Sequence, residues 1–281
     1  MQQELEIISR ARSHGGRLAF RSGTQKWTYD EILTRSAEVA ATLLDGADDL
    51  EEARVAFLAP SGFDYAVVQW AIWRAGGVAA PLCLSATEPE LEYALSDSQS
   101  AILVAARDWV ERVEPLRQRL ALRMVILEEV PTSASPRLPE VATERRAMIL
   151  YTSGTTSKPK GVVTTHANIQ AQIAMLTEAW EWSRNDSIPL FLPLHHIHGI
   201  INVMSCALWS GAAIEPFSRF DMTAVLDRVE AGAYTLFMAV PTIYVKIIQA
   251  LELLSDADRT AKIKGFAGMR LMVSGSAALP A

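Results

Sequence analysis

Cysteine is nearly absent from the chain, with two residues in 281. Two cysteines are too few for a disulfide framework or a cysteine-rich zinc cluster. Cys83 and Cys206 both lie in apolar stretches, so we expect small buried side chains in a reducing compartment. No block of basic residues stands out, because 26 lysines and arginines are set against 32 acidic residues and the net charge is −6. The sequence therefore predicts no nucleic-acid partner.

Long hydrophobic runs are also missing. The apolar run at residues 188–217 is interrupted by three histidines, by prolines and by Glu215, and its longest piece without these residues, 199–214, is shorter than the ~20 apolar residues that a membrane-spanning helix needs. The opening residues MQQELE lack the basic region and the apolar region of a secretory signal peptide. We therefore expect a cytoplasmic protein with no membrane partner.

Two common nucleotide-binding motifs are absent. The chain has no G-x-G-x-x-G for a Rossmann dinucleotide site. A Walker A loop needs a glycine followed by lysine five residues after its first glycine, and Pro159 stands at that distance from Gly154. Any phosphate-binding loop in this chain must therefore be of another kind.

The most informative segment spans residues 148–165 and reads MILYTSGTTSKPKGVVTT. A short apolar run gives way to a loop rich in hydroxyl residues, and a β-branched run follows. We expect two strands joined by a loop that holds a polyphosphate. Gly154 would expose backbone N–H groups, the hydroxyls would donate hydrogen bonds, and Lys158 and Lys160 would supply positive charge. The alternative is a solvated hairpin loop that is rich in hydroxyl groups by chance.

Strand-like and helix-like patterns alternate along the rest of the chain, half of which is hydrophobic. Repeated strand–helix units predict an α/β fold with parallel sheets covered by helices. The expected strands cover residues 54–58, 78–82, 101–105, 124–127, 187–192, 212–217, 236–240 and 271–273. The expected helices cover residues 29–44, 64–75, 88–96, 109–120, 166–180, 199–209, 222–231 and 241–254. The Pro- and Ser-rich stretch 131–139 is the expected internal boundary.

Three of the five histidines lie within residues 192–199, LPLHHIHG, between an expected strand and an expected helix. They have three interpretations. They could bind a metal, although neighbouring histidines on a turn diverge and no acidic or cysteine partner is close in sequence. They could cap the helix or bond the backbone. They could line a ligand pocket at the carboxyl end of a strand, where open α/β sheets bind ligands, and we favour this interpretation.

A second group of small residues follows the last expected strand, in the segment 271–280 that reads LMVSGSAALP. Small side chains allow a flat base or a short acid to lie against the backbone. A plain strand-to-helix turn is the alternative. The segment 237–244, FMAVPTIY, has a similar arrangement, with a strand that runs into a helix at a proline.

These segments resemble those of the adenylate-forming superfamily, whose phosphate loop residues 152–161 match at every position. That superfamily includes acyl-CoA synthetases, firefly-type luciferases and the adenylation domains of peptide synthetases. The resemblance implies two stacked parallel-sheet βα subdomains, approximately residues 50–185 and 186–281, with residues 1–49 packing on the second. They would form an incomplete N-terminal adenylation domain over residues 1–281, with the C-terminal lid domain absent.

The resemblance also implies the reaction. A carboxylate attacks the α-phosphorus of ATP, which gives acyl-AMP and pyrophosphate, and the thiolate of coenzyme A then displaces AMP. Mg²⁺ would bridge phosphate oxygens, with no metal ligand assigned in this chain. The implied catalytic residues are His196 and Lys160. The implied phosphate-binding residues are Thr152, Ser153, Gly154, Thr155, Thr156 and Lys160, and the implied acyl and adenylate pocket contains His196, Ile197, His198, Val240, Gly275, Ser276 and Ala277.

Within the superfamily, the segments HHIHG, MAVPTIY and MVSGSAALP look most like those of malonyl-CoA synthetases. A histidine at position 198, in place of a bulky apolar group, suggests a small or polar acid such as malonate. An aryl, fatty or amino acid stays open as the substrate.

Several family features are not found in residues 1–281. They are the Tyr-Gly-x-Thr-Glu segment, the ribose aspartate, the adenylation lysine and a cation for the second carboxylate. We therefore expect this chain by itself to be inactive or only partly active. A fragment that folds without turnover stays open, as does a homodimer.

Overall fold

The computed structural model describes residues 4–132, 137–152 and 158–278, and its largest sheet has six strands in the order β6-β5-β3-β4-β7-β8. Its strands are β3 (Arg54–Leu58), β4 (Val78–Pro81), β5 (Ile102–Ala105), β6 (Arg123–Ile126), β7 (Arg146–Thr152) and β8 (Lys160–Thr165). All neighbours are parallel except β7 and β8, which pair antiparallel. The two strands predicted around the hydroxyl-rich loop are thereby confirmed as a hairpin at the edge of the sheet.

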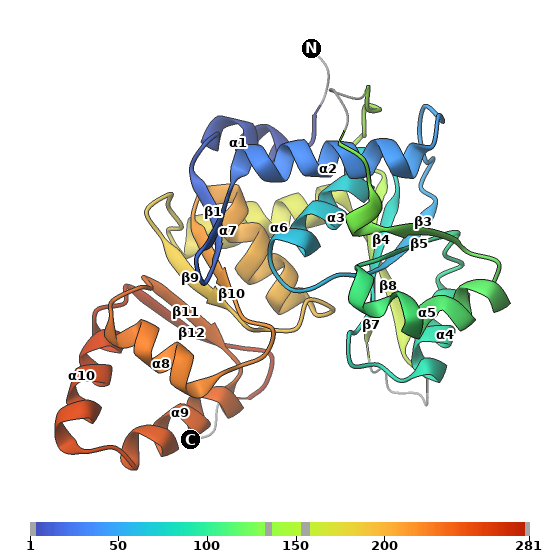
Figure 1. Ribbon diagram of the computed structural model, residues 1–281. Helices are drawn as coiled ribbons and strands as arrows, with labels where there is room; N and C mark the ends of the chain where they lie inside the picture. Colours follow the sequence, from blue (N-terminus) through green and yellow to red (C-terminus); the bar gives the residue numbers. More distant parts are fainter. Residues whose placement is uncertain (1–3, 133–136, 153–157, 279–281) are drawn as a thin grey trace.

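A second group of strands lies beside this sheet (Figure 1). Four strands have the order β2-β1-β10-β9, and β11 and β12 form a parallel pair. Their bounds are β1 (Leu18–Ser22), β2 (Gln25–Thr28), β9 (Ser187–Leu190), β10 (Ala213–Pro216), β11 (Leu236–Ala239) and β12 (Leu271–Ser274). The N–H of Thr235 donates to the carbonyl of Ser187, so β11 lies next to β9. The predicted α/β fold with parallel sheets is confirmed.

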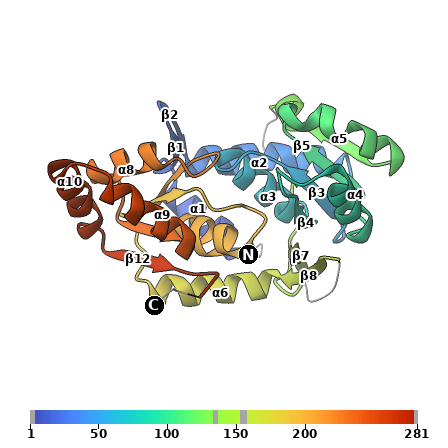
Figure 2. The same ribbon diagram turned by 90° about the horizontal axis from the view of Figure 1, so that it is seen from below.

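Helices cover both groups of strands (Figures 1 and 2). They are α1 (Glu6–His14), α2 (Tyr29–Leu44), α3 (Phe63–Arg74), α4 (Glu88–Asp97), α5 (Arg107–Arg119), α6 (His166–Ala179), α7 (Cys206–Ser210), α8 (Met222–Glu230), α9 (Pro241–Glu252) and α10 (Asp256–Ala267), with a short 3₁₀ turn η1 (Leu127–Glu129) and a π-helix η2 (His198–Ser205). Helices α8, α9 and α10 lie beside β11 and β12, whereas α4 and α5 lie beside the six-stranded sheet. None of the helices in the described ranges is both long and apolar enough to cross a bilayer.

Two sequence expectations differ from the structure, and some elements were not predicted from the sequence. The stretch 131–139 joins β6 to β7, which belong to one sheet, so it is not a boundary between sheets. The hairpin β1–β2 and the helices α1 and α10 were not predicted. The helix expected at residues 199–209 is a π-helix followed by a short α-helix. The limits of the two subdomains stay a prediction.

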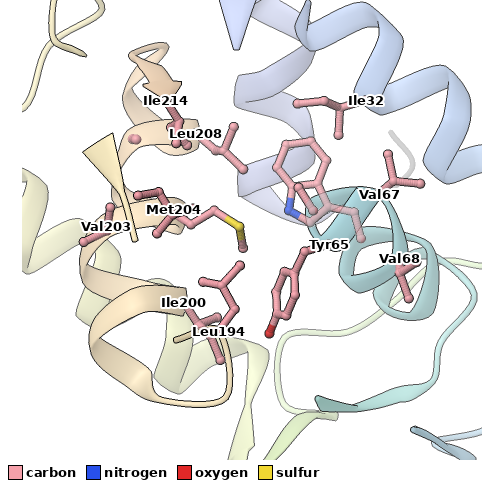
Figure 3. Packing of buried hydrophobic residues seen from close by; sticks show 14 of the residues in the cluster. Ile32, Tyr65, Val67, Val68, Leu194, Ile200, Val203, Met204, Leu208 and Ile214 are labelled. Atoms are coloured by element: carbon pink, nitrogen blue, oxygen red, sulfur yellow. The ribbon is translucent and has the colours of Figure 1, made fainter. Parts of the chain in front are cut away.

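The centre of the core is helix α3, whose residues from Tyr65 to Trp73 are all buried. A helix that is apolar on every side belongs in a protein interior, and α3 packs on α2 and faces η2 and α7. Figure 3 shows Ile200 and Met204 of η2 close to Tyr65 of α3. This core holds η2 against the rest of the molecule, and η2 begins at His198, one of the three histidines singled out in the sequence.

His166 should make the stability of the fold depend on pH. It is 5% exposed, its ring stands edge-on to Trp73 at 5.6 Å, and burial followed by the charge of Arg145 lowers its pKa to about 4. The unfolded chain binds a proton near pH 6.5, so this stabilisation is complete above that pH and is lost as the pH falls toward 4. We expect about 2 kcal/mol less stability at pH 5 than at pH 7 from this residue.

Urea unfolding of the parent and of a His166→Phe variant at both pH values checks this expectation. Phenylalanine keeps an aromatic ring at this position but does not titrate. The loss of stability between pH 7 and pH 5 should shrink in the variant. An equal loss in both proteins would contradict a role of His166.

Candidate functional site

The predicted motifs meet in one cavity of about 500 Å³. It lies where β7 ends, beside β8, and it is closed by the segment after β9, the start of η2 and the residues that follow β11 and β12. This is the carboxyl edge of parallel strands, where open α/β sheets bind ligands. The lining residues are Leu150, Tyr151, Thr152, Val162, Thr164, Leu192, Pro193, His195, His196, Ile197, His198, Gly199, Val240 and Ser276.

Six of the predicted site residues line this cavity: Thr152, His196, Ile197, His198, Val240 and Ser276. Lys160 is outside the lining, but it pairs with Thr152 across the hairpin and is exposed. Gly275 lies against His198, and Ala277 is exposed beyond the lining. Ser153, Gly154, Thr155 and Thr156 lie outside the described residues. The roles of all these residues stay predictions.

His198 is the most buried polar group of the cavity, with 5% exposure. Its Nδ1 lies 2.9 Å from the Oγ of Ser276, and its Nε2 is buried without a hydrogen-bond partner among the described residues. Burial lowers the pKa of the imidazole, so the ring is neutral at pH 7. A neutral ring donates from one nitrogen and accepts at the other, so the Nδ1 can pair with the hydroxyl of Ser276 in either role.

Backbone geometry holds this pair in place. A β-carbon on Gly275 would lie 3.2 Å from the Cε1 of His198, so glycine makes room for the ring. Ser276 has a φ of 67°, a left-handed conformation that is uncommon for a residue other than glycine. Backbone strain of this kind costs on the order of 1–3 kcal/mol and clusters at functional sites.

The turn that presents the histidines depends on a glycine. A β-carbon on Gly199 would lie 2.7 Å from the carbonyl oxygen of Pro193 and 3.1 Å from that of Leu192. Only glycine fits this close backbone approach without a shift. The π-helix that follows is of a type often found at functional sites.

His195 and His196 lie side by side with ring centroids 4.1 Å apart. Burial, and then the neighbouring His196, lowers the pKa of His195 to about 4. Within the described ranges, no three acidic, cysteine or histidine side chains are grouped so as to hold a metal ion. Mg²⁺ is held in proteins mainly by carboxylates, and the described lining of the cavity contains no aspartate or glutamate, so these residues do not fit a protein-held Mg²⁺. The expected magnesium stays a prediction.

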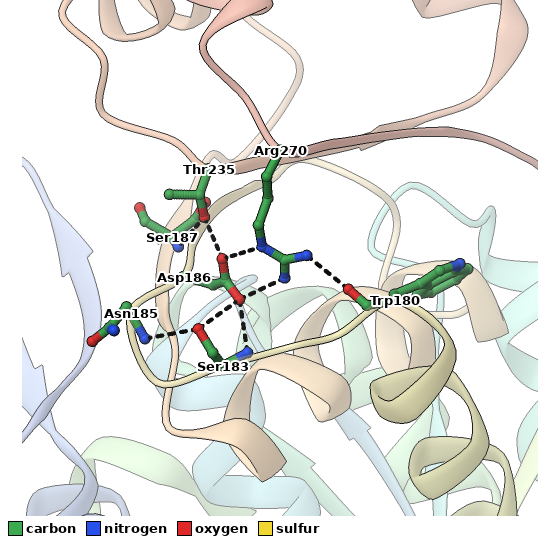
Figure 4. Close-up of polar contacts among 7 residues, drawn as sticks. All are labelled: Trp180, Ser183, Asn185, Asp186, Ser187, Thr235 and Arg270. Carbon is green, nitrogen blue, oxygen red and sulfur yellow. Dashed lines mark hydrogen bonds and ion pairs between the residues drawn. The ribbon is translucent and has the colours of Figure 1, made fainter.

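Two polar networks fix the strands that carry the far wall. Along the strands, the hydroxyl of Tyr244 donates a 2.9 Å hydrogen bond to Val273 O and lies 3.2 Å from Phe237 O, which ties β12 to β11. At their amino ends, Asp186 accepts hydrogen bonds from Arg270 and Thr235 (Figure 4). The wall formed by Val240 and Ser276 is therefore anchored by both networks.

Some lining residues were not predicted. Leu150 and Tyr151 precede the phosphate loop, and Val162 and Thr164 follow it on β8. Residues two apart in a strand point to the same face, so the alternation of Val162 and Thr164 was a usable signal. The sequence expectation covers the loop and leaves out the strands at its base.

Comparisons with known proteins agree with this geometry. Residues 8–281 match the family of AMP-binding enzymes. The malonate–CoA ligase ACSF3, mitochondrial, of Mus musculus is 39% identical, and the match covers 98% of this chain and 50% of the relative. Apo MatB from Rhodopseudomonas palustris superposes with a TM-score of 0.84 at 25% identity, over 98% of this chain and 55% of that chain.

A malonyl-CoA ligase solved as a ternary product complex with methylmalonyl-CoA and AMP superposes with a TM-score of 0.83 at 29% identity, over 99% of this chain and 56% of that chain. The chain thus spans about half the length of the curated relatives it matches. The expected cytoplasmic location and the open homodimer stay predictions. The family match covers nearly all of the sequence, and the chain belongs to the AMP-binding enzyme family.

Proposed function

We propose that the chain supplies the ATP- and acid-binding part of an acid–CoA ligase that acts on a small dicarboxylate, with malonate as the first candidate. The observation that supports it is a cavity of about 500 Å³. In it, the hairpin of β7 and β8, here called the phosphate hairpin, meets the pair formed by His198 and Ser276. Relatives named malonate–CoA ligase and malonyl-CoA ligase support the same reaction class.

In the proposed first step, a carboxylate oxygen of the acid attacks the α-phosphorus of ATP. The bond from this phosphorus to the bridging oxygen breaks, and pyrophosphate leaves. Such chemistry needs alignment and charge neutralisation more than covalent help from the protein. Thr152 and Lys160, at the two ends of the hairpin loop, would hold the leaving pyrophosphate, while His196 would lie beside the reacting carboxylate.

The second step forms the thioester. The thiolate of coenzyme A attacks the acyl carbon, and the bond to the AMP oxygen breaks. Coenzyme A, ATP and a small carboxylic acid are accordingly the proposed ligands of the complete protein, with Mg²⁺ bound to the phosphates.

Small polar acids are favoured by the end of the cavity. His198 and Ser276 form a polar pair in the lining of the cavity, and a ligand that offers this pair no polar group forgoes a hydrogen bond. A second carboxylate or another polar group of the acid would satisfy it. An alkyl chain or an unsubstituted aryl ring would not satisfy it. Fatty and aryl acids therefore rank below dicarboxylates as candidate substrates.

The test is pyrophosphate release by the complete gene product with a panel of acids. Malonate and methylmalonate should be the best substrates, and benzoate, an amino acid and a fatty acid should be poor. A preference for benzoate or a fatty acid would replace the dicarboxylate by that class. No release with any acid would remove the ligase proposal.

A His198→Leu variant should change the choice of acid. Leucine cannot donate or accept a hydrogen bond, so kcat/KM for malonate should fall about 10- to 100-fold, the size expected when a polar group loses its buried partner. Butanoate should lose much less, because it makes no polar contact at this end. The measurement is kcat/KM for both acids, with His14→Gln as a control for a histidine far from the cavity. An equal loss for malonate and butanoate would contradict the assignment.

For residues 1–281 expressed alone, a second candidate is binding without turnover. The relatives are about twice as long as this chain, and half of their length has no counterpart in these residues. Isothermal titration with ATP, beside the pyrophosphate assay, separates a fragment that binds nucleotide from an active one.

A further inference from the structure

Helix α4 holds the phosphate hairpin at both of its ends. The hydroxyl of Tyr93, on α4, donates a 2.8 Å hydrogen bond to the carbonyl of Pro159, next to Lys160. The hydroxyl of Tyr151, next to Thr152, lies 2.9 Å from Oδ2 of Asp97 on α4 and 3.2 Å from the carbonyl of Ala94. Each end of the loop is therefore bonded to the same helix one residue away from a predicted phosphate-binding residue.

The two tyrosines also touch each other. Their rings meet edge to face, with centroids 6.1 Å apart and planes at 71°. The Nζ of Lys158 lies 5.4 Å from the centroid of the Tyr93 ring, within the range of a cation–π contact. One aromatic pair thus joins the outgoing strand, the returning strand and a loop lysine.

Gly161 is the residue that permits this arrangement. It pairs with Tyr151 across the hairpin, and a β-carbon there would lie 3.0 Å from Cγ2 of Ile149 and 3.4 Å from Cζ of Tyr151. Without a side chain at position 161, the tyrosine ring can lie across β8. Aromatic rings that cover an edge glycine in this way help to fix strand register.

The hairpin needs such support because β8 is an edge strand. It has one neighbouring strand, β7, and its residues from Lys160 to Val163 are exposed. The hydrogen bonds between α4 and the hairpin reach Pro159, directly before β8, and Tyr151, on the paired strand β7. Burial raises the pKa of Tyr151, and burial and Asp97 raise that of Tyr93, so both hydroxyls remain donors well above neutral pH.

We propose that Tyr93 and Asp97 of α4, together with Tyr151, form a clamp that positions Thr152 and Lys160 for the phosphates of ATP. The proposal rests on the ligase function proposed above. Tyr93 and Asp97 are outside the lining of the 500 Å³ cavity and act through the hairpin, to which Tyr151 itself belongs. Binding energy that would otherwise be spent on ordering the loop is then available for aligning ATP.

The clamp predicts a graded series of variants of the complete gene product. Tyr93→Phe removes the hydroxyl, with its 2.8 Å bond to Pro159 and its 3.5 Å contact with Asp97, and keeps the ring, so KM for ATP should rise about three- to tenfold. Tyr93→Leu also removes the contact with Lys158, so the rise should be about 30-fold. Tyr234→Phe is the matched control, because it removes a 2.9 Å hydrogen bond to Glu215 in another part of the molecule and should leave KM unchanged.

Amide hydrogen exchange over residues 146–165 gives a second readout that does not require turnover. Exchange should be faster in Tyr93→Phe than in the parent and unchanged in Tyr234→Phe. Unchanged exchange in Tyr93→Phe overturns the clamp, whether or not the protein is a ligase. Faster exchange with an unchanged KM for ATP in an active enzyme overturns the positioning role. No pyrophosphate release by the parent protein is instead a failure of the proposed function, and the exchange result then decides on the clamp.

Discussion

Replacing Asp186 by alanine should lower the free energy of unfolding by about 3 kcal/mol, since breaking a buried ion pair leaves its partners without a counterpart. Asp186 is 4% exposed. It accepts hydrogen bonds of 2.8 and 2.6 Å from Arg270, of 2.7 Å from the hydroxyl of Thr235 and of 2.7 Å from the N–H of Ser183. The donors come from three separate segments of the chain, around residues 183, 235 and 270, which the carboxylate joins (Figure 4).

The electrostatics agree with a stabilising carboxylate. Burial alone would raise the pKa of Asp186, but the hydrogen bonds from Arg270, Thr235 and Ser183 outweigh it and lower the pKa below its usual range. A carboxyl group with a lowered pKa stabilises the fold above its unfolded pKa and loses that effect as the pH falls. Arg270 keeps 34% of its side chain exposed and can regain water, so we expect the lower end of the range for buried pairs.

Urea denaturation of Asp186→Ala measures the effect. Asp256→Ala is the matched control, because Asp256 forms a 2.6 Å ion pair with Arg259 while its own side chain is 94% exposed. Exposed pairs contribute about 0–1 kcal/mol, so the control should unfold close to the parent. Equal midpoints for Asp186→Ala and the parent would show that the network adds no net stability.

The sequence predicted best those elements whose signals are local. The bounds of α2, Tyr29–Leu44, agree with the prediction because Thr28 and Glu31 form a capping box and Asp45 ends the helix in a left-handed conformation. The hairpin β1–β2 was missed because it carries Arg21 and Lys26 and has a weak apolar pattern. Strand β1 is stabilised by its pairing with β10, which is far along the chain. No local sequence pattern predicts such a pairing.

In the site, too, local motifs could be predicted from the sequence, whereas contacts between distant segments could not. Its motifs could be found one by one, and the family resemblance implied that they share a pocket. The physical reason is that parallel strands present their carboxyl ends at one edge. The contact between His198 and Ser276 joins residues 78 positions apart, and the one between Tyr93 and Pro159 joins residues 66 apart. Such pairings depend on how the sheets and helices pack, so the sequence alone could not supply them.

Replacing Lys160 by alanine should reduce pyrophosphate release by the complete gene product about 100-fold or more, the size seen when one preorganised group that stabilises developing charge is removed. Lys160 opens β8 and pairs with Thr152, so these two residues flank the predicted phosphate loop. In the proposed reaction, the leaving pyrophosphate gains negative charge as the bond to the α-phosphorus breaks. A fixed positive charge at this point stabilises the transition state more than bound ATP, and kcat should therefore fall further than KM rises.

Two further variants test whether the effect is specific to the charge at position 160. Lys26→Ala is the matched control, because Lys26 is also exposed on the edge strand of an antiparallel hairpin, β1–β2, and its removal should leave the rate unchanged. Lys160→Arg keeps the charge with a different geometry and should recover part of the activity. Because Lys160 is exposed, the urea midpoint of Lys160→Ala should stay close to that of the parent, which separates a loss of catalysis from a loss of fold. Near-normal pyrophosphate release by Lys160→Ala would show that the loop binds phosphate without this lysine, and the charge would then have to come from elsewhere in the complete protein.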